Sequence, residues 1–168
     1  MGGITAREGI DISVYDSADG EGGEMNSRTI EILLVEDNPG DARLTLEACK
    51  EGSVLNNFTV MKDGVEVLAY LRRQSQYANS VQPDRILLDP NLPKKDGREV
   101  FTGIKADERL RNIPVVVLTT SAAEEGIARA YSRHANCYIT KPVDLNQFLR
   151  VVQSIESFWL TLVKLPSQ

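Results

Sequence analysis

The stretch IEILLVED, residues 30–37, decides the fold class of this chain. Its apolar part runs almost without polar interruption, which is typical of a strand buried on both faces of a parallel sheet. Two acids end the run, and Asn38 and Pro39 then supply a helix N-cap and a first helical residue. A buried strand that passes directly into a capped helix predicts the first unit of an α/β domain.

The same alternation continues outward from this stretch. Further apolar runs predict strands at 58–61, 85–89, 114–119 and 137–140. A helix is predicted after every strand, with the five helices opened by Asn38, by Asp63, by Asp96, near residue 122, and by Asp144. Five strands alternating with five helices predict a doubly wound parallel sheet that helices cover on both faces.

Apolar side chains mark the expected inner faces of these helices. For the first helix they are Ala42, Leu44, Leu46 and Ala48, and for the second Val65, Val67, Leu68 and Leu71. The third carries Val100, Phe101 and Ile104, and the last carries Leu145, Phe148, Leu149, Val152 and Ile155. We expect these residues to pack on the sheet.

The strands and helices occupy residues 29–156, which we expect to form one domain. Residues 1–28 are rich in Gly, Ser, Asp and Glu and are predicted to be a flexible acidic leader, native or added. Residues 157–168 follow the last helix and contain a cluster of apolar side chains: Phe158, Trp159, Leu160, Leu162, Val163 and Leu165. Because the last helix already has an apolar stripe, we expect this extension to contact a partner, most simply in a homodimer.

Charge and cysteine use narrow the functional classes. The net charge is -5, and the six acids and one base of residues 1–24 account for it. Without a basic stripe, the chain lacks the electrostatic features of a protein that binds nucleic acid or an anionic membrane. No signal peptide or membrane span is predicted, so we expect a cytoplasmic protein. Cys49, Cys137 and the single histidine, His134, are too scattered for a zinc site, and we expect reduced thiols and a surface histidine.

Functional side chains follow the predicted strands: Glu36 and Asp37, then Asp89, Thr119 and Lys141. Because ligands bind at the carboxyl ends of parallel strands, we expect these residues to converge. Carboxylates held together need a cation, and their oxygens suit Mg²⁺, for which Mn²⁺ could substitute. A lysine suits a phosphoryl oxygen, and a threonine hydroxyl can donate to another. The set predicts metal-dependent phosphoryl transfer to the carboxylate of Asp89.

Four stretches at these strand ends resemble response-regulator receiver domains of two-component systems: LLVEDNPGDA, LLDPNLPKKDG, VVVLTTSA and YITKP. The resemblance covers roughly residues 29–156 and implies the flavodoxin-like fold with strand order 2-1-3-4-5. It implies that Glu36, Asp37 and Asp89 bind the metal through side chains and Asn91 through its carbonyl. It also implies that a histidine kinase donates the phosphoryl group to Asp89.

The same resemblance assigns the remaining site residues. Lys141 would bind the phosphoryl group, together with the amides of Asn91 and Thr120. Thr119 and Tyr138 would be the coupled switch pair. The Lys141–Pro142 bond would be cis, since X-Pro bonds adopt this form most readily. The domain would catalyse only its own magnesium-dependent phosphorylation and dephosphorylation.

A narrower resemblance is to the stand-alone response regulators of bacterial phytochromes, above all the cyanobacterial ones. It rests on EDNPGDARLTLEA, the polar segment before Pro83, LTTSA, NCYITK and SFWLTLVKLP. It implies a phytochrome-type photoreceptor kinase as the donor. The output would be a protein–protein contact.

Two positions depart from the usual receiver pattern, and three other functions need weighing. Pro90 follows the phosphoacceptor and removes an amide donor, and Thr120 is bulky enough to slow hydrolysis of the acyl phosphate.

A flavin carrier on this fold needs a loop that binds phosphate through its backbone at the place where Glu36 and Asp37 stand. An aspartyl phosphohydrolase needs an acid where Asn91 stands. A pseudo-receiver that acts only as an interaction module stays open as the alternative.

Overall fold

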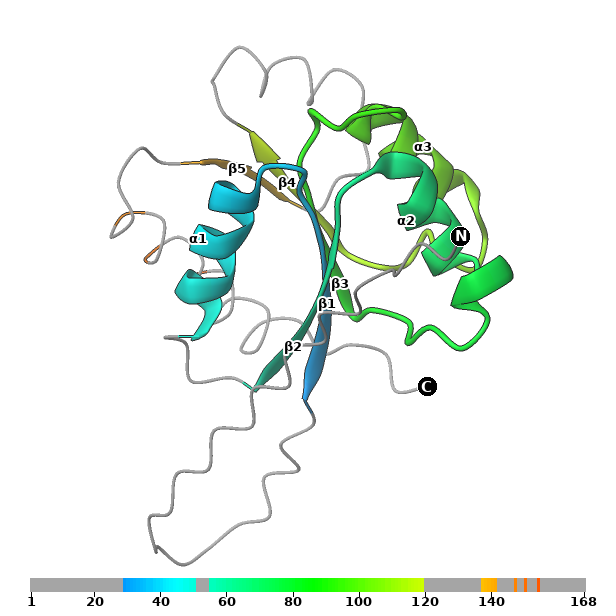
Figure 1. Cartoon of the computed structure of the whole chain (residues 1–168), viewed down its shortest axis with the longest axis horizontal. Helices are drawn as coiled ribbons and strands as arrows, with labels where there is room; N and C mark the ends of the chain where they lie inside the picture. Colours follow the sequence, from blue (N-terminus) through cyan, green and yellow to red (C-terminus); the bar gives the residue numbers. More distant parts are fainter. Residues whose placement is uncertain are drawn as a thin grey trace, which may run out of the picture.

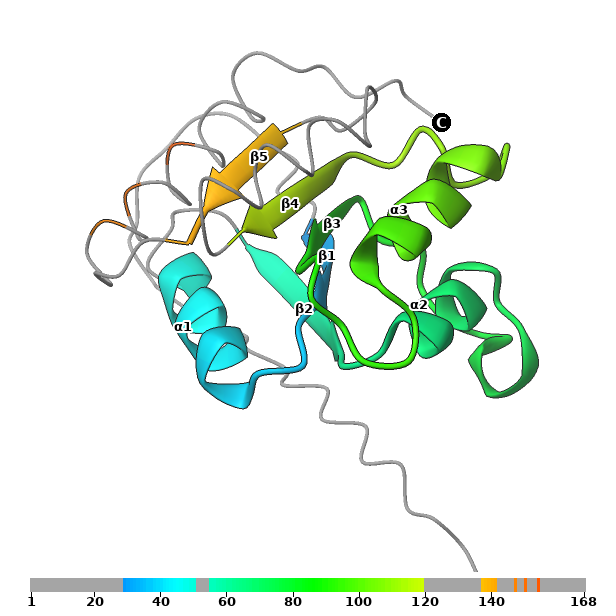
Figure 2. The same ribbon diagram turned by 90° about the horizontal axis from the view of Figure 1, so that it is seen from above.

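The computed structural model describes residues 29–50, 55–119 and 137–141, and Gln147, Arg150 and Ser154 as single positions. Its strands are β1 (Ile30–Val35), β2 (Asn56–Met61), β3 (Arg85–Leu88), β4 (Val115–Thr119) and β5 (Cys137–Thr140). They form one parallel sheet in the order β2-β1-β3-β4-β5 (Figure 2). This is the strand order that the resemblance to receiver domains implies.

The helices are α1 (Pro39–Lys50), α2 (Gly64–Leu71) and α3 (Gly97–Ala106), with a short 3₁₀ helix, η1, at Ser75–Tyr77. Helix α1 covers one face of the sheet, and α2 and α3 cover the other (Figure 1). The helix predicted near residue 122, residues 1–28 and 157–168, and His134 lie outside the described residues. Of the last predicted helix, three positions are described, and all three are helical.

Each of the three described α-helices begins where its predicted cap stands. The Asn38 side chain accepts from the amides of Gly40 at 2.9 Å and Asp41 at 3.2 Å, at the start of α1. Asp63 caps α2 by accepting from the first-turn amides at 2.9 and 3.0 Å, and Asp96 forms a capping box with Glu99 at the start of α3. Because a cap satisfies amides that lack a helical partner, it fixes where the helix starts.

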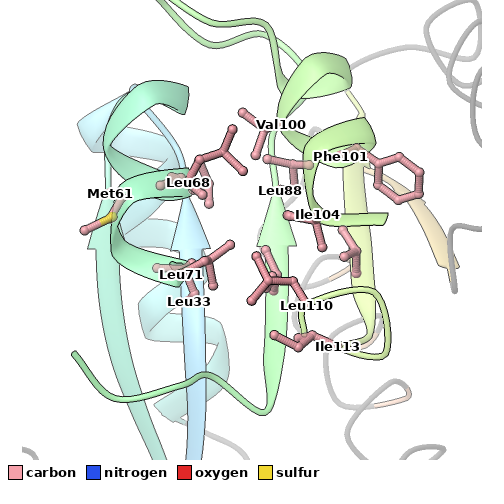
Figure 3. Packing of buried hydrophobic residues seen from close by; sticks show 14 of the residues in the cluster. Leu33, Met61, Leu68, Leu71, Leu88, Val100, Phe101, Ile104, Leu110 and Ile113 are labelled. Atoms are coloured by element: carbon pink, nitrogen blue, oxygen red, sulfur yellow. The ribbon is translucent and has the colours of Figure 1, made fainter. Parts of the chain in front are cut away.

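The buried strands divide their side chains between two cores. On β1, Ile32 and Leu34 lie in the cluster on the α1 side, which includes Ala42. Leu33 lies in the larger cluster under α2 and α3, whose members interdigitate in Figure 3. Burial on both faces explains why the strands read as continuous apolar runs.

Two residues of the predicted helix stripes are wrongly assigned. Leu44 is 42% exposed and Val65 is 55% exposed. In α1 the buried positions are Ala42, Thr45, Ala48 and Cys49, which follow the i, i+3, i+6, i+7 pattern of one helix face. Leu44 lies off that face and Thr45 lies on it, where the buried Thr45 hydroxyl is satisfied by donating to the Asp41 carbonyl at 3.0 Å. Val65 lies between Gly64 and Glu66 on the outer side of α2, whose buried positions are Gly64, Val67, Leu68, Tyr70 and Leu71.

A brace joins two loops at the carboxyl edge of the sheet. The Lys94 ammonium, in the β3–α3 loop, donates to the Asp63 carboxylate at 2.7 Å, and Lys94 adopts a φ of 62°. Burial raises the pKa of Asp63, but Lys94 and the two capping amides lower it by more, so the net pKa lies below its usual value. Beside this pair, a Cβ on Gly64 would lie 2.4 Å from the Lys95 carbonyl. The brace therefore holds the β3–α3 loop against the start of α2.

None of the helices in the described part of the chain has both the length and the apolar character needed to cross a membrane.

Candidate functional site

The structure brings together acids from two strand ends. Glu36 and Asp37 follow β1, and Asp89 follows β3. The Asp89 amide donates to the Val35 carbonyl at 2.9 Å and so extends the β1–β3 pairing to the base of the site. Carboxylate oxygens of Glu36, Asp37 and Asp89 all lie within 4.8 Å of one another. We call these three residues the acid cluster.

Asp89 is held in one orientation by a contact on each oxygen. Its Oδ1 accepts from the Asn91 amide at 2.7 Å, and its Oδ2 accepts from Lys141 Nζ at 2.7 Å. The side chain is only 7% exposed. The contact from Asn91 survives the departure at Pro90 because that proline removes only its own amide. Asp89 therefore points into the site as a buried, hydrogen-bonded carboxylate.

Gly97 packs closely against the backbone of Asp89 and Pro90. The Gly97 amide, at the start of α3, donates to the Pro90 carbonyl at 3.0 Å. A Cβ at position 97 would lie 2.4 Å from the Asp89 carbonyl oxygen and 2.6 Å from Pro90 Cα. These are backbone atoms that cannot rotate away. The loop that carries Asp89 can take its observed path only because residue 97 has no side chain.

Lys141 connects the far strand to these acids. It follows β5, and its ammonium donates to Glu36, to Asp89 at 2.7 Å and to Asp41 at 3.0 Å. The Lys141 side chain is 12% exposed and that of Glu36 is fully buried. One cation thus neutralises part of the charge of two buried carboxylates, Glu36 and Asp89, and of the more exposed Asp41.

The charges within the site shift two pKa values. Burial, together with the charge of Asp89, raises the pKa of Glu36 to about 7, although Lys141 and the Asn38 amide oppose the change. Burial lowers the pKa of Lys141, but its hydrogen bonds with Asp89 and Glu36 and their charges raise it by more, and the net shift is upward. Lys141 therefore stays charged, while Glu36 exchanges a proton near neutral pH.

This shift predicts how stability depends on pH. Because the folded protein holds the Glu36 proton more tightly than the unfolded chain does, the free energy of unfolding falls as pH rises from about 5 towards 7. We expect Glu36 to contribute a loss on the order of 1–3 kcal/mol without metal, and Glu36→Gln to remove most of it. Urea unfolding in EDTA between about pH 5 and pH 8 measures both slopes. Equal slopes for the two proteins would contradict the assignment.

Several predicted site residues are covered only in part. Thr119 is the last residue of β4, and Tyr138 lies in the neighbouring β5, but their side chains are outside what the structure describes. Thr120 and Pro142 lie outside the described residues. The predicted cis form of the Lys141–Pro142 bond is therefore not tested. Asn91 is exposed beside Asp89. The roles predicted for these residues remain predictions.

The sequence did not single out two residues of the site. Asp41 contacts Lys141 from the first turn of α1, and Gly97 supports Asp89 from below. An acid in the first turn of a helix, such as Asp41, is explained by its interaction with the helix dipole, so the sequence gives no reason to expect its contact with Lys141. The only signal for Gly97 is its place after a helix cap, directly beyond the loop that carries Asp89.

The acid cluster suits a divalent cation by its chemistry. Its three carboxylates supply hard oxygen ligands within one small space, as Mg²⁺ and Mn²⁺ require. Among the described residues, the buried Glu36 carboxylate accepts hydrogen bonds only from the Lys141 ammonium and the Asn38 amide. A second cation would offset the burial and the repulsion from Asp89 that together raise the pKa of Glu36. The residues therefore fit a bound metal ion.

Comparison with known proteins gives a consistent result. A family model described as the response regulator receiver domain matches residues 32–153. The response regulator Rcp1 of Synechocystis sp. is 48% identical over 136 residues, which are 81% of this chain and 92% of that protein.

Two solved structures are similar in both sequence and shape. The phosphorylated cyanobacterial phytochrome response regulator RcpA is 51% identical with a TM-score of 0.76, over 83% of this chain and 100% of that one. The Mn²⁺-bound form of Rcp1 is 48% identical with a TM-score of 0.74, over 82% of this chain and 99% of that one.

Proposed function

The chain belongs to the response regulator receiver family, and from this premise we propose that Asp89 accepts a phosphoryl group from a histidine kinase. The observation that carries the proposal is the contact of one Asp89 oxygen with the Lys141 ammonium at 2.7 Å, inside the acid cluster. A buried carboxylate with a cation bound to one of its oxygens is a suitable nucleophile for a transferring phosphoryl group.

The phosphoryl transfer needs only the phosphohistidine, Asp89 and the cations that surround it. An oxygen of Asp89 forms a bond to phosphorus while the phosphorus–nitrogen bond of a phosphohistidine breaks, and the imidazole nitrogen keeps the electron pair. Lys141 moves from the carboxylate to the phosphoryl oxygens, where it balances their charge. Mg²⁺ held by Glu36, Asp37, Asp89 and the Asn91 carbonyl would neutralise further charge on these oxygens.

The remaining roles follow the family pattern. The amides of Asn91 and Thr120 bind the phosphoryl group, and Thr119 moves toward it. Tyr138 follows, and the surface of the fourth helix, the fifth strand and the fifth helix changes. The coupling of Thr119 with Tyr138 is supported by the pairing of β4 with β5. In that pairing Tyr138 lies opposite Val117, two residues before Thr119. The change then alters a protein–protein contact.

We assign a phytochrome-type histidine kinase as the donor and a cytoplasmic protein contact as the output. The support is the identity of about half of all aligned residues with RcpA and Rcp1, over nearly the full length of both. A homodimer through residues 157–168 is the expected form of the contact. Neither nucleic acid nor a membrane is required.

Removal of metal tests the proposal directly. Incubated with acetyl phosphate and Mg²⁺, the protein should gain one phosphoryl group by intact mass, and in EDTA it should gain none. Mn²⁺ should restore the adduct. Borohydride, which reduces an acyl phosphate, should mark residue 89 in the peptide map. A phosphorylated phytochrome-type kinase in place of acetyl phosphate then tests the donor.

The opposite outcome has a definite meaning. If a folded, Mg²⁺-loaded protein gains no phosphoryl group, the proposed transfer is wrong. The better description is then an interaction module that works without phosphorylation.

A further inference from the structure

Lys141 has a partner that the acid cluster does not include. Asp41 is the third residue of α1, and its Oδ2 accepts from the Lys141 ammonium at 3.0 Å. The Asp41 side chain is 37% exposed, whereas those of Glu36 and Asp89 are 0% and 7% exposed. The ammonium thus spans from the buried acids to one acid nearer to solvent.

The position of this ammonium conflicts with metal binding. Lys141 contacts Oε2 of Glu36 and Oδ2 of Asp89, and both residues belong to the acid cluster. A divalent cation and the ammonium would compete for these oxygens and repel each other at short range. If Lys141 depended on the cluster alone, each metal ion would have to displace it from all its anionic partners.

Asp41 offers an anionic partner outside the cluster. Its backbone is fixed in the first turn of α1, because its amide donates to the Asn38 side chain at 3.2 Å and its carbonyl accepts from Thr45 at 3.0 Å. A carboxylate at a helix start is also favoured by the helix dipole. The backbone that carries the Asp41 carboxylate is therefore held by contacts that do not involve the acid cluster.

We propose that Asp41 is a positioning residue that retains the Lys141 ammonium at the edge of the site when a divalent cation binds to the acid cluster. The inference rests on the proposed metal site and adds a residue to it. Asp41 acts through Lys141, so its effect on metal affinity exists only while residue 141 carries a charge. Lys141 then remains close enough to transfer to an incoming phosphoryl group.

A double-mutant cycle on metal affinity tests this inference. Mg²⁺ binding is measured by calorimetry, and Mn²⁺ binding by electron paramagnetic resonance, for the wild type, Asp41→Asn, Lys141→Met and the double variant. Asp41→Asn should weaken binding about two- to fivefold when Lys141 is present, as for a partly exposed ion pair. In the Lys141→Met background, Asp41→Asn should leave the affinity unchanged.

A matched control separates position from charge. Glu47→Gln removes the same charge from the same helix, but Glu47 pairs with the exposed Arg43 at 3.0 Å. Its effect on metal affinity should be smaller than that of Asp41→Asn. Thermal melting checks that each variant is folded, and Lys141→Gln provides a second background if Lys141→Met does not fold.

The outcomes are distinguishable. An equal loss of affinity in both backgrounds would make Asp41 a simple surface charge and overturn the inference, as would no loss in either. A wild type that binds neither Mg²⁺ nor Mn²⁺ would instead overturn the metal site of the proposed function. Neither readout depends on phosphorylation.

Discussion

Asp89→Asn is expected to abolish the phosphoryl adduct completely. A side-chain amide lacks the anionic oxygen that bonds to phosphorus, so the acyl phosphate cannot form. The change keeps the shape of the side chain, and an amide oxygen can still accept from the Asn91 amide that now donates at 2.7 Å. Intact mass after acetyl phosphate and Mg²⁺ should therefore show no adduct, while far-ultraviolet circular dichroism shows a folded protein.

Asp37→Asn is the matched control for this loss. It removes one charge from the same acid cluster but leaves Asp89 in place. This variant should still form the adduct, with a need for more Mg²⁺ because one ligand is weaker. A full adduct on the Asp89→Asn protein would mean that another residue accepts the phosphoryl group.

Gly97→Ala is expected to destabilise the protein by about 1–3 kcal/mol, the range for an overpacked site that forces a backbone shift. The new Cβ would lie 2.4 Å from the Asp89 carbonyl oxygen and 2.9 Å from that of Pro90. Either α3 or the β3–α3 loop must move. Because Asp89 moves with its loop, phosphorylation in the folded fraction should slow by about tenfold or more. Urea unfolding and the rate of adduct formation measure the two effects.

Gly103→Ala provides the comparison within the same helix. Its Cβ would lie 3.3 Å from the terminal carbons of Leu68, which belong to a side chain that can adjust. Alanine also favours a helix by roughly 1 kcal/mol relative to glycine. We expect a change in stability close to zero and an unchanged phosphorylation rate. A similar loss at both glycines would show that the close approach at Gly97 is unimportant.

Much of the fold is predictable because it depends on local patterns. The apolar runs locate the strands to within about two residues, and Asn38, Asp63 and Asp96 mark the helix starts through their cap contacts. The errors at Leu44 and Val65 have one cause. Apolar character alone does not place a residue on the inner face, which depends on the 3.6-residue helix period.

The candidate site is predictable to the extent that strand ends define it. Glu36, Asp37 and Asp89 follow predicted strands, and the parallel sheet brings them to one edge. The contact of Asp41 with Lys141 is different, because it joins residues 100 positions apart. It depends on how α1 is placed over the edge of the sheet, and no local pattern encodes that placement. The switch role of Thr119 and Tyr138 and the phosphate-binding role of Thr120 come from the family resemblance, and the side chains of all three lie outside what the structure describes.

The brace between Asp63 and Lys94 has a consequence for how such sequences can diverge and be recombined. The ion pair at 2.7 Å and the close approach of Gly64 to the Lys95 carbonyl make the turn before α2 and the loop after β3 complementary surfaces. A change of charge at either end, or a side chain at position 64, leaves the other half without its match. We therefore expect a chimera that exchanges residues 90–96 to be more stable when residues 63–64 are exchanged with them.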